Sequence, residues 1–356
     1  MSSKVTMQQI ADSLGVSKFV VSRALAGKEG VSDTTRERVI QMATQLGYFA
    51  QKNAYMKTVQ TEQLPKVSKQ HRQSVLVLMP NIRFQTRESL YWGRILDGIS
   101  ARLEADGYGM VIVSEQSVDH FAHFLNPNGI LGLIGVGEIS TSLLLEVHRL
   151  GLPLVLVDHE DPLIPSDTLF ANNFESVYRL TRHLIGIGHR RLAFVGSTDY
   201  SRSFYDRYLG FRSALEAEGM GDGLGSSHNA QLLAVDGLQH EDAVEPVKRW
   251  LEERKREESL PTALVCANDM IAIGAAQAVQ SLGLRVPDDI SVSGFDNIED
   301  AARMTPPLTT VNVPKEALGK RAVERLLKRV EEKDEPTEKI MLACELLYRG
   351  STTGGR

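Results

Sequence analysis

The chain has 356 residues, of which 42% are hydrophobic and 24% charged, so we expect two or three domains with sizeable cores. Its two cysteines lie in apolar runs, which argues against a disulfide scaffold. No segment has the composition of a signal peptide or the length of a membrane span, so we expect a cytoplasmic protein and not a membrane protein. The net charge of −5 is unevenly distributed, because residues 1–73 carry 11 Lys+Arg against 5 Asp+Glu whereas the remainder carries 29 against 40, as is typical of a polyanion-binding head on a different body.

Residues 6–27 have the pattern of two short helices joined by a tight turn. Thr6 followed by Gln9 is the sequence signature of a capping box, so it marks the start of the first helix. Gly15 allows the left-handed turn that ends a helix, and Ser17 is a suitable N-cap for the second. The apolar residues of both segments recur at helical spacing, which predicts a helix-turn-helix.

The second predicted helix has a polar side that suits DNA. Lys18, Ser22 and Arg23 lie opposite its apolar residues, where their side chains can meet phosphates and base edges. The alternative is an ordinary helical hairpin in a core, but the position at the start of the chain and the local charge favour DNA binding. Ser32 marks a third helix, and residues 49–73 are polar, basic and without periodicity, as expected for a linker.

From residue 74 the chain alternates between apolar runs and amphipathic segments. This alternation predicts strands and helices in a doubly wound parallel sheet, and a second set begins near residue 171. The last part, from LTTVNV onward, does not have the pattern of a third complete domain. We therefore infer that the chain crosses back and completes both α/β units, which leaves two lobes with a cleft between them.

Polar side chains follow the predicted strands at their carboxyl ends, where open parallel sheets bind ligands. Asp158 follows PLVLV, and Asp296 follows ISVSGF. Asn268 and Asp269 follow ALVCA, and Arg207 lies near the start of the helix after RLAFVGS. Carboxylates, an amide and a guanidinium match sugar hydroxyls by hydrogen bonding. The alternative is that they are helix caps and turn residues, which is the preferred interpretation for Asp269.

Residues 5–48 resemble the DNA-binding headpiece of the LacI/GalR family of bacterial transcription regulators, through IADSLGVS, VSRALAG, VSDTTRERV and LGY. The body is similar to the periplasmic sugar-binding-protein fold, through GHRRLAFVGS, DRYLGFRSAL, PTALVCANDMIAIGA, LGLRVPDDISVSGFD and TPPLTTV. The resemblance implies an N-terminal all-α helix-turn-helix headpiece and a two-lobed α/β periplasmic-binding-protein-like body. The expected units are a headpiece with hinge (1–57), a linker (58–73) and an effector-binding and dimerisation domain (74–356), with lobe 1 about 74–170 and 303–330 and lobe 2 about 171–302 and 331–350.

The resemblance implies a sequence-specific repressor that binds a near-palindromic operator as a homodimer. The sequence has no nucleophile elbow, P-loop or GxGxxG after a strand, so enzyme activity is the minor hypothesis, and we expect no metal and no cofactor. Lys18 and Phe19 stand where the family's specificity-determining residues lie, so we expect Lys18 to donate to guanine and Phe19 to contact a thymine methyl. The expected DNA-binding residues are Thr6, Ser17, Lys18, Phe19, Ser22, Arg23, Lys52 and Lys57.

The resemblance also implies a small effector, a sugar or sugar derivative, in the cleft. Arg207 matches the family's effector-binding arginine in R-x-x-G, and Asp296 matches the aspartate in GFD. Asn268 matches the asparagine of the AND motif, and Asp158 lies at the family's cleft position after the fourth strand. The expected effector-binding residues are Phe84, Asp158, Arg207, Asn268 and Asp296.

Two further groups of residues have alternative interpretations. In the first βα loop, Phe84, Tyr91 or Trp92 could stack on a sugar ring, or these rings could pack in the core or at the dimer contact. His120-x-x-His123 and the run DHED at 158–161 invite a metal interpretation. The first has no obvious third ligand, and the second resembles a polar connection between lobes, so we expect neither to bind metal.

The chain departs from the family pattern at two places. Asn172-Asn173 stands where many relatives have Asp-Asn. In the hinge, the expected leucine wedge position holds Lys57, preceded by Met56. Either Met56 is the wedge in a shifted helix, or the operator is bent little and Lys52 and Lys57 contact the DNA backbone. We favour the second, in which Lys57→Ala weakens binding to all sequences.

Two other functions stay open on the sequence alone. A protein corepressor could control the body in place of a small molecule, and a sugar-binding protein without DNA function is an alternative that would not need the basic head. The sequence leaves open whether dimers pair into tetramers, although no heptad repeat follows Arg349. The terminal STTGGR is expected to be flexible.

Overall fold

The structure is a computed structural model that describes residues 6–25, 32, 35, 38–39, 42, 73–79, 91–114, 129–220 and 230–355. The chain divides into two compact units, Met1–Gln70 and His71–Arg356, which we call the head and the body and describe separately. In the described ranges, no helix is long and apolar enough to cross a bilayer. Several sequence-based expectations lie outside the described residues, namely those for Lys52, Met56, Lys57, Phe84, His120 and His123.

The head contains the predicted helix-turn-helix, formed by α1 (Met7–Leu14) and α2 (Lys18–Leu25). Thr6 caps α1 through a capping box, because its backbone N–H donates to the Gln9 side chain at 2.8 Å and its hydroxyl accepts from the Gln9 N–H at 3.3 Å. Gly15 ends α1 with φ 65°, and the Ser17 hydroxyl accepts from the N–H of Val20 at 3.3 Å. A small core holds the two helices together, with Ile10, Ala11, Val21, Ala24 and Val39 buried in it.

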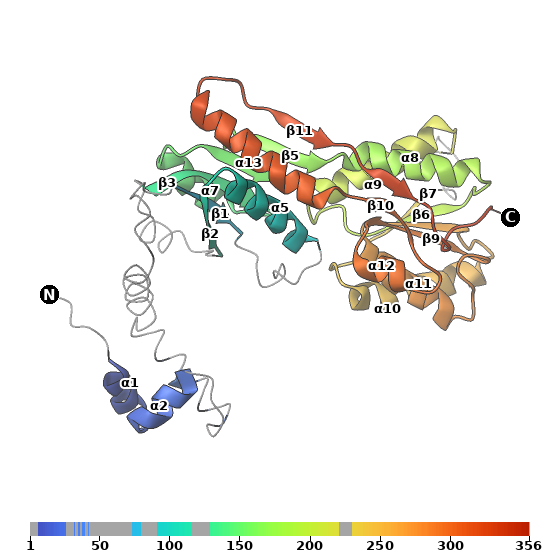
Figure 1. Cartoon of the computed structure of the whole chain (residues 1–356). Helices are drawn as coiled ribbons and strands as arrows, with labels where there is room; N and C mark the ends of the chain where they lie inside the picture. The colour runs from blue at the N-terminus through green and yellow to red at the C-terminus, as the bar shows by residue number, and fades with distance from the viewer. Residues whose placement is uncertain are drawn as a thin grey trace. The chain divides into compact units, whose positions relative to one another are not determined.

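The body is built on two six-stranded sheets (Figure 1). The first sheet has the order β11-β5-β4-β3-β1-β2 and is parallel throughout. The second has the order β12-β10-β9-β8-β6-β7, and its edge strand β12 alone is antiparallel. The first-sheet strands are β1 (Ser74–Leu78), β2 (Gly109–Val113), β3 (Ile130–Val136), β4 (Leu154–Val157), β5 (Asp167–Ala171) and β11 (Lys339–Leu342). The second-sheet strands are β6 (Leu192–Val195), β7 (Ala230–Leu233), β8 (Ala263–Cys266), β9 (Ser291–Asp296), β10 (Thr309–Asn312) and β12 (Glu345–Leu347).

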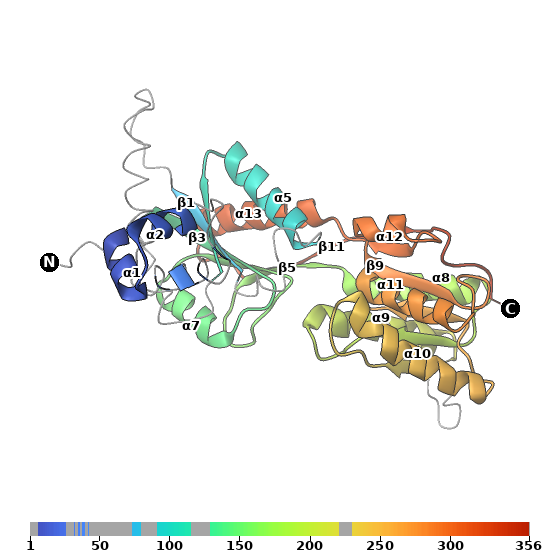
Figure 2. The ribbon, with the colours of Figure 1, turned by 90° about the horizontal axis from the view of Figure 1, so that it is seen from below.

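Helices cover both faces of the first sheet, as Figure 2 shows. Helices α5 (Trp92–Ala105) and α13 (Lys315–Glu331) lie on one face, and α7 (Thr141–Arg149) lies on the other. Strand β1 explains this arrangement, because its successive side chains point to opposite faces. Val75 and Val77 pack in the same cluster as α5 and α13, whereas Leu76 and Leu78 pack with α7.

Helices α5 and α13 cross closely enough to require glycine at the contact. A Cβ on Gly98 would lie 2.2 Å from the Glu316 carbonyl oxygen, and one on Gly319 would lie 2.1 Å from that of Ile95. Both distances are shorter than any van der Waals contact, so a larger residue at either position would push the helices apart. This contact ties a helix from the first half of the chain to one near its end.

The second lobe contains the remaining helices. α8 packs against α9, and α10 packs against α11. The largest side chains in its core are the fully buried rings of Phe194, Phe211 and Phe295. The helices are α8 (Asn173–Gly186), α9 (Arg202–Ala217), α10 (His240–Arg256), α11 (Asp269–Ser281) and α12 (Glu299–Arg303).

The chain crosses between the lobes three times, after β5, after β10 and after β11. The last part therefore completes both lobes, as expected, but the boundaries differ from the sequence-based ones. Strand β10, assigned to lobe 1, lies in the second sheet, and β11, assigned to lobe 2, lies in the first. For β11 the reason is that KIMLACELL has the pattern of one apolar strand, whereas the strand breaks at 343–344 so that β11 pairs with β5 and β12 with β10.

The expectation that the terminal STTGGR is flexible is wrong for its described residues, 351–355. Ser351 is fully buried, and its hydroxyl donates to the Val292 carbonyl at 2.6 Å and accepts from the Thr309 N–H at 2.8 Å. The carbonyl of Thr353 lies 2.9 Å from Nε2 of the buried His189. The tail is therefore part of the second lobe's packing.

We expect Ser351→Ala to lower the free energy of unfolding by about 1–3 kcal/mol, because it leaves the buried Thr309 N–H without its acceptor. Urea unfolding followed by circular dichroism measures the change. Ser142→Ala, at an exposed position of α7, is the control and should change stability by less than about 0.5 kcal/mol. If Ser351→Ala lowers the free energy of unfolding by no more than Ser142→Ala does, the Ser351 hydroxyl contributes nothing to stability.

Candidate effector cleft and DNA-binding head

A cavity of about 480 Å³ lies in the body between the two lobes. It lies where the carboxyl ends of strands from both sheets meet, which is where parallel sheets bind ligands. Phe84 lies outside the described residues. The other four expected effector residues all line the cavity: Asp158, Arg207, Asn268 and Asp296.

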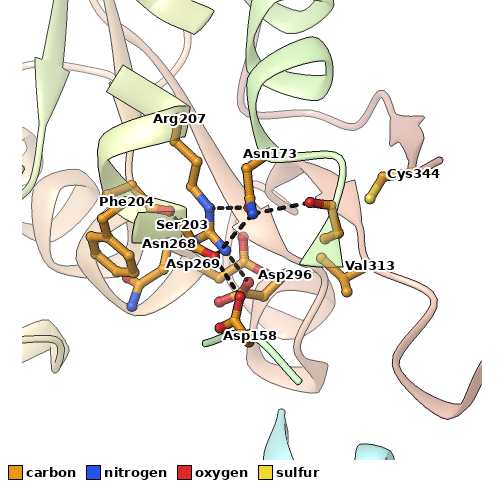
Figure 3. Close-up of polar contacts among 12 residues, drawn as sticks. Asp158, Asn173, Ser203, Phe204, Arg207, Asn268, Asp269, Asp296, Val313 and Cys344 are labelled. Carbon is orange, nitrogen blue, oxygen red and sulfur yellow. Dashed lines mark hydrogen bonds and ion pairs between the residues drawn. The ribbon is translucent and has the colours of Figure 1, made fainter. Parts of the chain in front are cut away.

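Arg207 lines this cavity and is held in place by several partners (Figure 3). It projects from α9 and is only 2% exposed. Its Nε donates to Asn173 Oδ1 at 2.8 Å, and Nη1 donates to the Ala267 carbonyl at 2.6 Å. Nη2 lies 3.6 Å from Oδ1 of Asp296, and the guanidinium lies 3.8 Å from the centroid of the Phe295 ring. These contacts fix the guanidinium before any ligand arrives.

Two partly buried carboxylates are attracted by this guanidinium. Burial, against the attraction of Arg207 and Lys315, raises the pKa of Asp296 to about 6. Burial also raises the pKa of Asp158, against its hydrogen bond from Ser203. Among the described residues, Oδ1 of Asp296 has no hydrogen-bond partner. This oxygen is buried, and it lies 3.6 Å from Nη2 of Arg207.

The backbone at both carboxylates is unusual. Asp158 has φ 55° and Asp296 has φ 112°, in a region that side chains other than glycine rarely adopt. Such conformations persist where the surrounding structure imposes them, and they concentrate at functional sites. Here they lie at the ends of β4 and β9, where each chain turns out of its sheet.

A polar chain connects Arg207 to the first lobe. Asn173, which accepts from Arg207, donates to the Ser203 hydroxyl at 3.0 Å, and Ser203 donates to Asp158. Ser203 belongs to α9 in the second lobe, whereas Asp158 follows β4 in the first. This hydrogen bond therefore joins the lobes across the cleft.

The asparagine pair that departs from the family pattern has two separate roles. Asn172 is the N-cap of α8, since its side chain accepts from the Glu175 N–H at 3.4 Å. Asn173 is buried and belongs to the Arg207 network. The change from aspartate in many relatives to Asn172 therefore affects a helix cap, and Arg207 keeps its asparagine partner.

Asn268 and Asp269 are engaged by the fold. Asn268 caps α11, because its Oδ1 accepts from the Ile271 N–H at 2.8 Å, and its amide donates to the Leu238 carbonyl at 3.3 Å. Asp269 is fully buried and accepts from the Ile298 N–H at 2.9 Å, and burial raises its pKa to about 8. Asp269 is thus structural, as the sequence indicates, and Asn268 lines the cavity while serving as a cap.

Aromatic rings from both lobes line the cavity. Tyr91 and Trp92, at the start of α5, form an edge-to-face pair with centroids 4.9 Å apart. Tyr200 and Phe204 form a second such pair in the second lobe, at 5.0 Å. In the described part of the chain the buried hydroxyl of Tyr91 has no hydrogen-bond partner. The cavity therefore has flat apolar surfaces on both sides, which suit a ring-shaped ligand.

An ion pair closes the rim of the cavity. Arg202 of the second lobe contacts Glu160 of the first, and its Nε also donates to Asp206 at 2.8 Å. Asp161 accepts from the Leu163 N–H at 2.8 Å and the Thr141 hydroxyl at 2.6 Å, so this acidic run is a turn. Among the described residues, no group of three or more His, Cys, Asp or Glu is arranged to hold a metal ion.

The head presents its expected DNA-contacting side chains on α2. Lys18 and Ser22 are exposed, and Phe19 is 67% exposed, which is unusual for a ring of its size. The guanidinium of Arg23 lies 5.5 Å from the centroid of the Phe19 ring. Thr6 and Ser17 use their hydroxyls as caps. The accessible side of α2 is thus basic and partly apolar.

Two family models match the chain: "Bacterial regulatory proteins, lacI family" over residues 6–51 and "Periplasmic binding protein-like domain" over residues 181–352. The chain belongs to the LacI family of bacterial regulatory proteins. This LacI-family chain is 27% identical over 354 residues to the ribose operon repressor of Haemophilus influenzae, covering 97% of this chain and 98% of that protein.

A second relative of this LacI-family chain is the HTH-type transcriptional repressor PurR of Haemophilus influenzae (strain PittEE), 29% identical over 355 residues, with 97% and 98% of the two chains covered. Among solved structures, the lac repressor dimer bound to operator and the anti-inducer ONPF has the same fold. Its TM-score is 0.63 at 24% identity, covering 99% of this chain and 100% of that one. Both relatives are named as repressors, which confirms that this family member is a regulator and not an enzyme.

Several residues of the site in this LacI-family protein escaped the sequence analysis. The sequence pattern gives Asn173 no role beyond its departure from the family pair, although it closely follows the end of β5 as Asp158 follows that of β4. Ser203 and Tyr200 flank the start of α9 close to Arg207, and that proximity is the signal that could have indicated them. Phe204 is one turn before Arg207 on the same helix face, its ring 5.0 Å from the guanidinium.

We expect Lys18→Ala in this LacI-family protein to change base preference, at a cost of about 1–3 kcal/mol for the preferred operator. The exposed position of Lys18 at the start of α2 allows its ammonium to reach guanine. Competition binding to a randomised operator pool measures the change. Equal weakening on every sequence would show that Lys18 contacts only phosphate.

Proposed function

We propose that this protein is a transcriptional repressor that binds operator DNA as a homodimer through its head and is controlled by a small effector, a sugar or sugar derivative, in the cleft. The observation that carries the proposal is the fixed Arg207 guanidinium beside Asp296 and Asp158, at the junction of two lobes. The similarity to a ribose operon repressor supports the sugar, and that to an operator-bound dimer supports the assembly.

The effector would act by favouring one arrangement of the lobes. A ligand can shift such an equilibrium only through different affinities for the two arrangements. Asp158 belongs to the first lobe, and Arg207 and Asp296 belong to the second. A ligand that contacts all three residues binds best at one particular separation of the two lobes. It would also replace or reinforce the bond from Ser203 to Asp158.

The proposed dimer contact is the α5 surface of the first lobe and its neighbours, as the family resemblance implies. The adjacent β2 is an edge strand and exposes the apolar side chains of Val111 and Ile112. Burial of these side chains against a second copy would favour association. Sedimentation at micromolar protein tests the dimer, and a monomer with full operator affinity would contradict it.

The function is tested by measuring operator binding with and without sugars. A thermal-shift screen identifies which sugars and derivatives bind, because a ligand raises the melting temperature by mass action. Each hit is then added to the labelled operator complex, and fluorescence anisotropy reports the change in affinity. A protein that binds operator but ignores every small molecule would favour control by a protein corepressor. A protein that binds sugars but no DNA would favour a sugar-binding protein without DNA function.

We expect effector affinity to fall in acid, because the pKa of Asp296 is about 6 in the free cleft. An effector that donates to the ionised carboxylate lowers this pKa on binding. Binding is therefore strongest above the free pKa and weakens below it, by up to about tenfold per pH unit. Calorimetry between about pH 5 and 7.5 measures the slope, and Asp296→Asn should flatten it. Affinity that rises toward low pH would contradict this role of Asp296.

A further inference from the structure

Four charged side chains form a continuous chain across the rim of the cleft. Glu160 follows β4 in the first lobe and accepts at 2.6 Å from the ammonium of Lys339, which belongs to β11 of the same lobe. Arg202 is the first residue of α9 in the second lobe, and its Nε donates to Asp206, one turn further along α9, at 2.8 Å. The two halves meet because Nη1 of Arg202 contacts the other carboxylate oxygen of Glu160. We call these four residues the rim chain.

Each member of the pair that crosses between the lobes is held by its own lobe. Lys339 orients the Glu160 carboxylate from the first lobe, and Asp206 orients the Arg202 guanidinium from the second. Exposed ion pairs are usually weak, partly because two long side chains lose entropy when they are held in one geometry. Here a partner within each lobe already orders the two side chains. The crossing pair therefore contributes more than an isolated surface pair does.

The crossing pair is charged and accessible to solvent. Burial acts to raise the pKa of Glu160, but the hydrogen bond from Lys339 and the charges of Arg202 and Lys339 outweigh it, so the pKa is lowered and the carboxylate is ionised at neutral pH. The Arg202 side chain is 46% exposed and that of Glu160 is 23% exposed, so salt ions reach the pair and screen it. Separating the lobes breaks this pair and leaves Lys339 with Glu160 and Asp206 with Arg202.

We propose that the rim chain is an ionic latch, in which the pair between Arg202 and Glu160 favours the lobe arrangement of this structure. The strength of the pair then sets how readily the lobes separate, and ionic strength alone shifts the populations of the two arrangements. The latch is a property of the body and does not rest on the proposed function. It acts beside the deeper bond from Ser203 to Asp158, which also joins the lobes.

The test measures the separation of the lobes in the full chain without an effector. Ser142→Cys on α7 and Arg249→Cys on α10 provide one exposed attachment site for a dye on each lobe, whereas the native Cys266 and Cys344 are buried. Labelled chains are mixed with an excess of unlabelled chains, and single-molecule energy transfer reports the populations of the arrangements. We expect Glu160→Gln to shift the ratio of populations toward separated lobes by about two- to fivefold, the range for an exposed pair.

A matched control removes an ion pair of the same kind that stays within one helix. Glu216→Gln removes the partner of Arg212, 3.0 Å away on α9, and should leave the populations unchanged. Arg202→Gln and its combination with Glu160→Gln should each give the same shift as Glu160→Gln alone, because either change breaks the pair. Single effects that add in the double variant would contradict a pairwise latch.

Salt gives an independent measurement of the same pair. Raising potassium chloride from about 0.05 to about 0.5 M should shift the parent toward separated lobes and should have little effect on Glu160→Gln, since screening acts on exposed pairs. Populations that are equal in the parent and in Glu160→Gln at both salt concentrations would overturn the inference. A chain whose operator binding responds to a sugar while its lobes ignore both changes would lack the latch and still have the proposed function.

Discussion

Arg207→Ala is expected to abolish the effector response and to leave basal operator binding by the head intact. The side chain is buried, pairs with Asp296 and donates to Asn173 and to the Ala267 carbonyl. Removing it leaves Asp158 and Asp296 without their shared cation, and truncating one partner of a buried charged pair costs about 2–5 kcal/mol. Effector titrations of the operator complex should then show more than a tenfold loss of effector affinity.

Two further variants test whether the loss is specific to the contacts of Arg207. Arg207→Lys keeps the charge but cannot make the planar set of contacts, so it should lose most of the response. Arg212→Ala removes an arginine from the exposed side of the same helix, where it pairs only with Glu216 among the described charges, and should respond normally. If Arg207→Ala responds as the parent does, the effector binds elsewhere.

Asp167→Asn is expected to give the largest loss of stability in the body. Asp167 is 1% exposed at the start of β5, and its two oxygens accept from Arg329 at 2.8 and 3.0 Å. It also pairs with Arg325 at 3.0 Å and accepts from the Glu338 N–H at 2.7 Å. Breaking a buried pair of this kind by changing one partner costs about 3–5 kcal/mol, because Arg329 and the buried Arg325 lose the anion that they share.

The same carboxylate predicts how stability depends on pH. Burial acts to raise the pKa of Asp167, but the bonds from Arg329, Glu338 and Arg325 outweigh it, so the pKa is lowered. A lowered pKa means that the contribution is complete above the unfolded-state value of about 3.8 and is lost as the pH falls through the folded-state pKa. Urea unfolding at neutral pH and acid titration measure both effects. Asp334→Asn, an exposed aspartate just after α13, should change neither, and an equal loss in both variants would refute the assignment.

The strand-end rule predicted much of the cleft. Asp158, Arg207 and Asp296 come together because parallel strands bring their carboxyl ends to one edge of each sheet, and this follows from the apolar runs alone. The partners Asn173 and Ser203 do not follow from any run, because their contacts join residues 30 to 45 positions apart and depend on how α8 and α9 pack.

Two expectations fail or change for a related reason. Asn268 matches the AND motif, but its side chain also caps α11. This second role is evident only when the first residue of α11 is known. Ser351 lies in a short polar segment whose composition is typical of a flexible terminus. Composition does not show that distant parts of the chain, such as Thr309, pack around this residue. Burial of this kind is a property of the tertiary structure.

The three crossings between lobes constrain how the protein is made. The first sheet lacks its edge strand β11 and its covering helix α13 until residue 342 has been synthesised, and the second lacks β12 until residue 347. While the chain is still on the ribosome, the apolar face that Leu318, Val323 and Leu326 later cover stays open to water and chaperones. A message truncated shortly before its end would yield two unfinished lobes, a target for proteolysis. Neither lobe can be excised from this chain by a single cut.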